Sequence, residues 1–179
     1  RNLYYKHSKK DQEKKSKSEH FKNLSKITSS LSSRLALSLV GKTAVVPLSG
    51  GYDSRYVLCA LIDSGVTDII CYTYGNKDSF EVKTAKKVAD SMGVILYVVE
   101  YNETKWEKLL EDEMFISYVD YSFNYSSLPH IQDFIAIAEL KEQGIFDDKC
   151  VFIPGFCGDL LGGSYIPTEV LEKSEHLLP

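Results

Sequence analysis

Along the chain, short apolar runs alternate with segments in which apolar residues recur every three or four positions. The runs have the length and the Val, Ile and Tyr content of buried strands, and they cover residues 43–48, 68–75, 94–101 and 150–154. The segments between them have helical spacing, and they cover residues 55–64, 79–92, 104–118 and 131–143. This alternation predicts an α/β doubly wound fold, a parallel sheet with helices on both faces.

Local signals refine these elements. Gly93 and Gly144 are placed to end two of the helices, and Thr104 with Glu107 forms a capping-box pattern for the helix over 104–118. A loop rich in aromatic residues is expected after that helix, and it contains Tyr118, Tyr121, Phe123 and Tyr125. An upstream helix ending near Gly41 has one apolar face, formed by Phe21, Leu24, Ile27, Leu31 and Leu35.

These patterns divide the chain into three parts. We expect a lysine-rich helical segment over residues 1–40, an α/β domain over 41–165 and a short tail over 166–179. Because the chain starts at Arg1 in the middle of a pattern rather than at Met, we expect it to be a fragment of a longer protein.

The segment between the first predicted strand and the next helix reads Leu-Ser-Gly-Gly-Tyr-Asp-Ser-Arg, over residues 48–55. Adjacent glycines let the backbone approach a charged ligand closely and adopt angles closed to other residues. Ser49 and Ser54 offer hydroxyls, and the first N–H groups of the helix point at an anion. Asp53 would repel phosphate unless Mg²⁺ bridges the two, so the loop predicts a magnesium and phosphate site. A tight Gly-Gly turn capped by Asp or Ser is the alternative.

Composition narrows the class of protein. The net charge of -4 argues against binding of nucleic acid through bulk positive charge, and the apolar runs are too short for a membrane-spanning helix. The four cysteines lack the spacing of a zinc site. With no signal peptide visible in the sequence, we expect a reducing, cytoplasmic compartment.

The loop resembles the PP-loop, the Ser-Gly-Gly-x-Asp-Ser signature of ATP pyrophosphatases, which cleave ATP between its α- and β-phosphates. Further along, Thr73-Tyr74-Gly75 ends the second strand, and Gly155-x-x-x-Asp159 leads to Gly162-Gly163. Together the three features resemble the synthetase domain of the asparagine synthetase family, over roughly residues 39–164. The resemblance implies a PP-loop ATPase fold that uses ATP and Mg²⁺. It also implies activation of a carboxylate as an acyl-adenylate, followed by attack of an amine or ammonia.

The same resemblance implies roles for individual residues. Tyr74 and Gly75 would contact adenine through backbone atoms, and Asp159 would join Asp53 in holding Mg²⁺ and pyrophosphate as metal-binding and catalytic residues. The residues expected to bind ATP are Leu48, Ser49, Gly50, Gly51, Tyr52, Asp53, Ser54, Arg55, Tyr74, Gly75 and Gly155. The expected partners are a small-molecule carboxylate substrate and a glutaminase domain or subunit that supplies ammonia.

One departure from the family changes the expected substrate. The third motif of the family has a glutamate at the reacting centre, and Phe156 replaces it here. A phenyl ring can neither hold a cation nor transfer a proton, so we expect a substrate other than aspartate. Two alternatives stay open: a PP-loop sulfurtransferase that acts on RNA through Cys157, and a nucleotide-binding module without catalysis.

Side chains outside these motifs complete the candidate site. His130 is a candidate catalytic acid or base, or a substrate-recognition residue, with Asp133 to orient it; a plain first helical turn is the alternative. Arg55 contacts a phosphate or a substrate carboxylate, or it faces solvent. The aromatic loop lines a substrate pocket or packs in the core. Because ligands bind beyond the carboxyl ends of parallel strands, Ser49, Gly75 and Gly155 should form one cleft that His130 faces.

Overall fold

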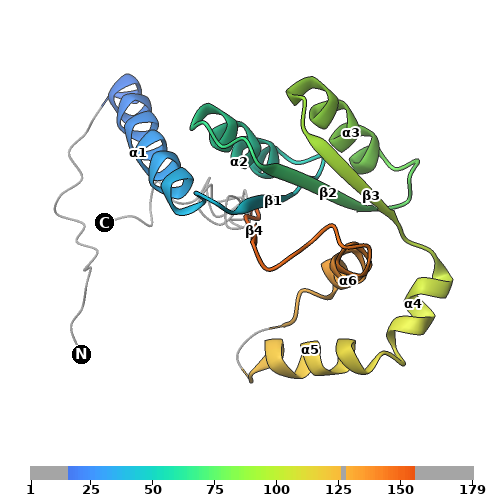
Figure 1. The fold of residues 1–179 in the computed structure, drawn as a ribbon. Helices are drawn as coiled ribbons and strands as arrows, with labels where there is room; N and C mark the ends of the chain where they lie inside the picture. Colours follow the sequence, from blue (N-terminus) through green and yellow to red (C-terminus); the bar gives the residue numbers. More distant parts are fainter. Residues whose placement is uncertain (1–15, 126–127, 156–179) are drawn as a thin grey trace, which may run out of the picture.

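The computed structural model describes residues 16–125 and 128–155, and in this part of the chain the strands form one parallel sheet in the order β3-β2-β1-β4 (Figure 1). The strands are β1 (Thr43–Pro47), β2 (Ile69–Gly75), β3 (Ile95–Glu100) and β4 (Cys150–Phe152). The helices are α1 (Lys17–Ser38), α2 (Tyr52–Asp63), α3 (Phe80–Met92), α4 (Glu103–Leu109), α5 (Glu113–Phe123), the 3₁₀ turn η2 (Ile131–Asp133) and α6 (Phe134–Glu142). The predicted α/β parallel fold is confirmed.

Alternate residues of β1 enter two different cores, as expected for a central strand with a period of two. Ala44 and Val46 pack on the side of α2 and α3, with Leu58 among their neighbours. Val45 packs on the opposite side with Tyr72 and residues of α6. Figure 1 shows the same division, with α1, α2 and α3 on one face of the sheet and α6 on the other. The sheet is therefore covered by helices on both faces.

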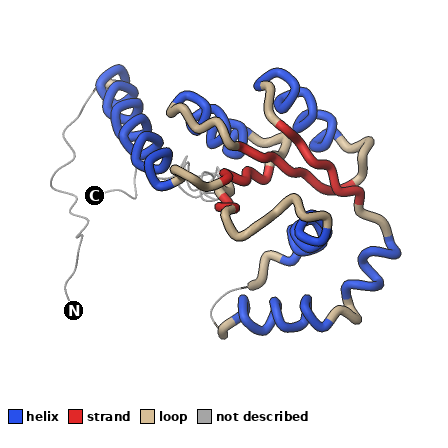
Figure 2. The backbone as a smooth tube through the Cα atoms, in the orientation of Figure 1, coloured by secondary structure: helices blue, strands red, loops and turns tan. Residues whose placement is uncertain are grey.

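A third cluster lies beyond α6. Leu109 of α4, Phe115 of α5 and Ile135 of α6 pack together, and Tyr118 and Phe134 lie against them. Figure 2 shows α4 and α5 as two separate helices on the chain path between β3 and α6. This long crossover carries the chain from β3 at one edge of the sheet, across the face that α6 covers, to β4 at the opposite edge.

Capping explains why α3 has the predicted bounds. The Ser79 hydroxyl accepts a hydrogen bond from the Val82 N–H at its start, at 3.3 Å. At its end, Gly93 has φ of 66°, the left-handed conformation that glycine adopts without strain. Both signals can be read directly from the sequence.

The prediction of one helix over 104–118 is wrong, because two side chains start separate helices there. Asn102, rather than Thr104, caps α4, and its side-chain oxygen accepts the Lys105 N–H at 2.9 Å. The Asp112 carboxylate accepts two backbone N–H groups in the first turn of α5, at 2.7 and 3.2 Å.

Two further expectations need correction. The expected aromatic loop is mostly helical, because Tyr118, Tyr121 and Phe123 belong to α5.

In the PP-loop, Gly50 and Gly51 are not among the glycines with positive φ, and Gly51 has φ of -76° as the N-cap of α2. The expectation that the two glycines adopt backbone angles closed to other residues is therefore wrong. What they contribute to the loop is the lack of a side chain, which leaves room for close approach to the backbone.

The predicted apolar face of α1 exists but is largely exposed. None of the α1 residues is buried, and Phe21, Leu24, Ile27 and Leu31 expose between 56% and 61% of their surface. Only the C-terminal end of α1 joins the core, through Leu35 and the following Leu39. The division of the chain into a helical segment (1–40), an α/β domain (41–165) and a tail (166–179) stays a prediction. Residues 166–179 lie outside the described part.

Candidate functional site

A cleft of about 520 Å³ opens at the carboxyl edge of the sheet, where β1 separates β2 from β4. The strand order reverses at this point, because β2 and β3 lie on one side of β1 and β4 lies on the other. Open α/β sheets bind ligands at such a position. The lining residues are Pro47, Leu48, Ser49, Gly51, Asp53, Ser54, Tyr72, Thr73, Tyr74, Glu81, His130, Gln132, Asp133, Pro154 and Gly155.

Two serines hold the PP-loop in a closed turn at one side of this cleft. The hydroxyl of buried Ser54 accepts the Ser49 N–H at 3.1 Å and lies 3.0 Å from the Ser49 hydroxyl. The Ser49 oxygen in turn accepts the Gly51 N–H at 3.2 Å. The loop is therefore braced by its own side chains before any ligand binds.

Gly155 forms the second side of the cleft by direct contact with the start of α2. A Cβ atom at this position would lie 2.6 Å from the Ser54 nitrogen and 2.8 Å from the Asp53 carbonyl carbon. No real Cβ atom tolerates such distances to backbone atoms, so only glycine lets β4 approach the loop this closely. The contact joins two predicted ATP-binding segments that are far apart in the sequence.

Arg55 makes contacts that the sequence did not predict. Its Nε donates to the Gly51 carbonyl and its Nη2 to the Gly50 carbonyl, both at 2.9 Å. Its guanidinium carbon lies 4.4 Å from the centre of the Tyr52 ring. The side chain therefore points back to the PP-loop and is not among the cleft-lining residues.

The third side of the cleft carries an imidazole, a carboxylate and a phenol in contact. His130 Nδ1 lies 3.1 Å from an Asp133 carboxylate oxygen. Burial, and then a hydrogen bond to Asp133 and the negative charge of Asp133, raise the pKa of the Tyr74 phenol. With a proton on Nδ1, the His130 ring donates to the Asp133 carboxylate. Asp133 orients both rings.

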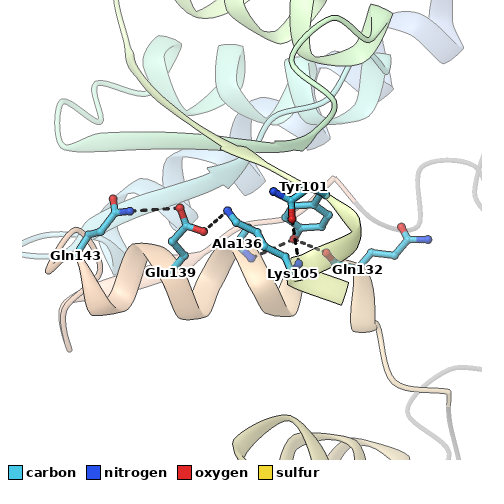
Figure 3. Close-up of polar contacts among 7 residues, drawn as sticks. Tyr101, Lys105, Gln132, Ala136, Glu139 and Gln143 are labelled. Atoms are coloured by element: carbon cyan, nitrogen blue, oxygen red, sulfur yellow. Dashed lines mark hydrogen bonds and ion pairs between the residues drawn. The ribbon is translucent and has the colours of Figure 1, made fainter. Parts of the chain in front are cut away.

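Two tyrosines hold the backbone of this segment in place (Figure 3). The Tyr101 hydroxyl donates to the Gln132 carbonyl at 2.7 Å and accepts the Ala136 N–H at 3.0 Å. The Tyr118 hydroxyl donates to the His130 carbonyl at 3.0 Å. Tyr101 also stacks on Tyr74, with ring centres 5.0 Å apart, which links η2 to the end of β2. These contacts bring the start of α6 to the cleft.

Lys105 of α4 supports the same helix from outside the cleft. Figure 3 shows its ammonium group against the Glu139 carboxylate, which also accepts a hydrogen bond from Gln143. This ion pair connects α4, at the start of the crossover, to α6, at its end. His130 lies on the segment between these two helices.

The charges on the described lining of the cleft are acidic. Asp53, Glu81 and Asp133 are its carboxylates, and the described lining residues include neither Lys nor Arg. Oxygen donors of this kind suit Mg²⁺, which would let a polyphosphate lie beside Asp53. In the part of the chain that the structure describes, no three His, Cys, Asp or Glu side chains lie close enough to hold a metal ion. The expected second ligand, Asp159, lies outside the described residues.

The structure brings most of the predicted site residues together. Leu48, Ser49, Gly51, Asp53, Ser54, Tyr74, Gly155 and His130 all line the cleft. Gly75 and Tyr52 are not among its lining residues, and Tyr52 is 83% exposed. Gly50 is not among the lining residues either, and an added Cβ there would contact Glu81 and Phe80 at 3.4 to 3.6 Å. Phe156 and Cys157 lie outside the described residues.

Two polar residues of the cleft, Glu81 and Gln132, were not predicted from the sequence, and the pocket role considered for the aromatic loop does not match the described lining. Glu81 was not singled out from the sequence, although its place in the first turn of α3, the helix that follows β2, could have identified it. Gln132 gave no signal. The described aromatic residues of α5 and its C-terminal end do not line the cleft, and Tyr121 and Tyr125 expose 86% and 95% of their surface.

Comparison with known proteins agrees with this geometry. A family model described as Queuosine biosynthesis protein QueC matches residues 43–129, which include the PP-loop, β2 and β3. No curated protein matches the chain.

Among solved structures, the chain is similar to an NH3-dependent NAD synthetase from Campylobacter jejuni subsp. jejuni NCTC 11168, solved in complex with the nitrate ion. The TM-score is 0.52 at 15% sequence identity, over 78% of this chain and 59% of that one. The match shows the fold, and this chain spans about three-fifths of that structure's length. The family-model match supports the PP-loop resemblance of the sequence, and the structural match shows a shared α/β fold. None of the described helices is long and apolar enough to cross a membrane.

Proposed function

We propose that this chain carries the synthetase domain of an ATP-dependent enzyme that adenylates the carboxylate of a small molecule. The observation that carries the proposal is the convergence on one cleft of the PP-loop, Tyr74, Gly155 and the His130–Asp133 pair. A phosphate-binding loop alone would suit many nucleotide-binding proteins. A proton-carrying side chain opposite the loop is what acyl transfer needs in addition.

In this proposal the PP-loop and the start of α2 bind the phosphates, and adenine lies near Tyr74 and Gly75. Asp53, with Asp159, would hold Mg²⁺, which would neutralise phosphate charge and let the acidic lining accept ATP. A carboxylate oxygen of the substrate attacks the α-phosphorus of ATP. The bond from that phosphorus to its bridging oxygen breaks, and pyrophosphate leaves.

The second half of the proposed reaction forms an amide. The nitrogen of ammonia or an amine attacks the acyl carbon, and AMP leaves with the bonding electrons. His130, held by Asp133, takes the proton that the nitrogen loses. The structural neighbour is named as an NH3-dependent synthetase, and this supports ammonia as the nitrogen donor. We propose an acyl substrate other than aspartate, because Phe156 stands where the asparagine synthetase family has its motif glutamate.

ATP–pyrophosphate exchange tests the adenylation step directly. The 179-residue chain is supplied with ATP, Mg²⁺ and labelled pyrophosphate over a panel of small carboxylates that includes aspartate. We expect exchange that depends on one class of carboxylate other than aspartate. Exchange with aspartate alone would contradict the substrate assignment.

Calorimetry with ATP tests the metal assignment separately. Asp53→Ala should weaken Mg²⁺-dependent ATP binding about tenfold, or about 1.4 kcal/mol. Asp63→Ala is the matched control, because Asp63 is exposed at the other end of α2. ATP binding without exchange on any carboxylate would favour the module without catalysis, and unchanged affinity in Asp53→Ala would rule out Asp53 as a metal ligand.

A further inference from the structure

The position of Arg55 is unusual for a cation. It is the fourth residue of α2, near the positive end of the helix dipole, where a positive charge is unfavourable. The side chain avoids this by turning back to the two glycine carbonyls of the PP-loop at 2.9 Å each. Carbonyl oxygens are the negative ends of peptide groups, so they offset the unfavourable field.

These contacts need a guanidinium group. Its donors form a rigid planar fork, so Nε and Nη2 reach two carbonyls at once while the flat face lies on the Tyr52 ring, 4.4 Å away. A lysine ammonium carries the same charge but has no fork and no flat face. The arrangement is therefore specific to arginine rather than to positive charge.

Holding a carbonyl oxygen also fixes the N–H at the other end of its peptide group, because the peptide unit is planar and trans. The two held carbonyls belong to the peptide groups that carry the N–H of Gly51 and the N–H of Tyr52. The Gly51 N–H bonds to Ser49, and the Tyr52 N–H is in the first turn of α2, whose N–H groups have no partner within the helix.

We propose that Arg55 is a positioning residue for the phosphate-binding loop, which rests on the proposed ATP site there. From behind the loop it holds the Gly50 and Gly51 carbonyls away from the cleft, so that the amides at the start of α2 face an incoming phosphate. Arg55 itself does not contact the nucleotide and stays bonded to the loop when ATP binds. This role differs from the direct phosphate contact that the sequence suggested.

Calorimetry with MgATP compares wild type, Arg55→Lys and Arg55→Gln, with Arg34→Lys on exposed α1 as the matched control. A positioning role predicts that Arg55→Lys loses about tenfold in affinity and that Arg55→Gln loses about as much. A direct phosphate contact predicts instead that Arg55→Lys keeps most of the affinity, and that the loss in Arg55→Gln shrinks as salt is added.

NMR of the wild-type chain gives a readout that does not depend on how the variants fold. We expect the Arg55 Nε–H resonance to be little changed by MgATP, while the amide resonances of Gly51 and Tyr52 shift. Movement of the Nε–H resonance on binding, or unchanged affinity in both Arg55 variants, would overturn the positioning role. Failure of wild type and Arg34→Lys to bind MgATP would instead contradict the proposed function.

Discussion

At the scale of single residues, the site depends on backbone approach more than on charged side chains. Gly155 touches the backbone of Asp53 and Ser54, and the Ser49 and Ser54 hydroxyls close the loop on itself. The described lining of the cleft has no Lys or Arg, so in the proposed ATP site the phosphates would be bound by amides, hydroxyls and the metal that Asp53 would hold.

Replacing Gly155 with alanine should disturb the loop. The added methyl would lie 2.6 Å from the Ser54 nitrogen, so β4 and α2 must separate. We expect a loss of about 1 to 3 kcal/mol in the free energy of unfolding by urea, together with weaker ATP binding. The control is Gly41→Ala, where φ of 74° costs stability but nothing lies within 4 Å. Equal ATP affinity in both variants would contradict the prediction.

Cys71 gives a second prediction, on pH. Burial in β2 raises the pKa of its thiol from 9.0 to about 12. The folded state therefore keeps this proton between pH 9 and 12, whereas the unfolded state loses it. Its contribution to stability is complete below pH 9 and falls above it, by up to about 1.4 kcal/mol per pH unit. Urea unfolding should show a shallower decline for Cys71→Ala above pH 9, and equal slopes would contradict the assignment.

At the scale of elements, the crossover from β3 to β4 decides what faces the PP-loop. The 3₁₀ turn η2 and the start of α6 are attached to the sheet through Tyr101, whose hydroxyl bonds two backbone groups. Stacking of Tyr101 on Tyr74 continues the attachment to β2. The position of His130 therefore depends on a residue far from it in the chain.

Removal of the Tyr101 hydroxyl should loosen this attachment. Tyr101→Phe leaves the Ala136 N–H and the Gln132 carbonyl without their bond, at a cost of about 1 to 3 kcal/mol in unfolding free energy. Tyr97→Phe is the matched control, since the side-chain hydroxyl of Tyr97 in β3 makes no hydrogen bond to the described residues. Hydrogen exchange should also be faster at the start of α6 in Tyr101→Phe alone. Similar losses in the two variants would contradict this role.

At the scale of the molecule, the sheet separates two buried cores, and α1 lies largely outside both. Leu58 of α2 is fully buried against the sheet, whereas Leu24 of α1 is 57% exposed. Apolar residues with the same helical spacing therefore contribute differently to the free energy of unfolding in the two helices, since burial from water is what stabilises the fold.

A pair of identical substitutions measures this difference. Leu58→Ala should cost about 2 to 5 kcal/mol in unfolding free energy, because it leaves a cavity in the core. Leu24→Ala should change it by about 0.5 kcal/mol or less. Urea unfolding at low and high protein concentration checks both values. A large loss for Leu24→Ala would mean that the apolar face of α1 is covered in solution.

The sequence alone determined the local features of this protein. Strand periodicity, the cap residues Ser79 and Gly93 and the loop Ser49–Ser54 all depend on neighbours within a few positions, so the α/β class and the start of the site were predictable. The predicted helix over 104–118 was wrong for two local reasons. Asn102 caps α4 where the sequence offered Thr104 as an alternative cap, and Asp112 starts the separate helix α5.

Tertiary structure decided which distant residues meet. The strand order brought β4 beside β1, which placed Gly155 on the α2 backbone. The crossover placed His130 and Asp133 opposite the PP-loop, and packing left the apolar face of α1 exposed. Such contacts join residues whose separation along the chain carries no local signal, so only the folded arrangement of the sheet and its helices could establish them.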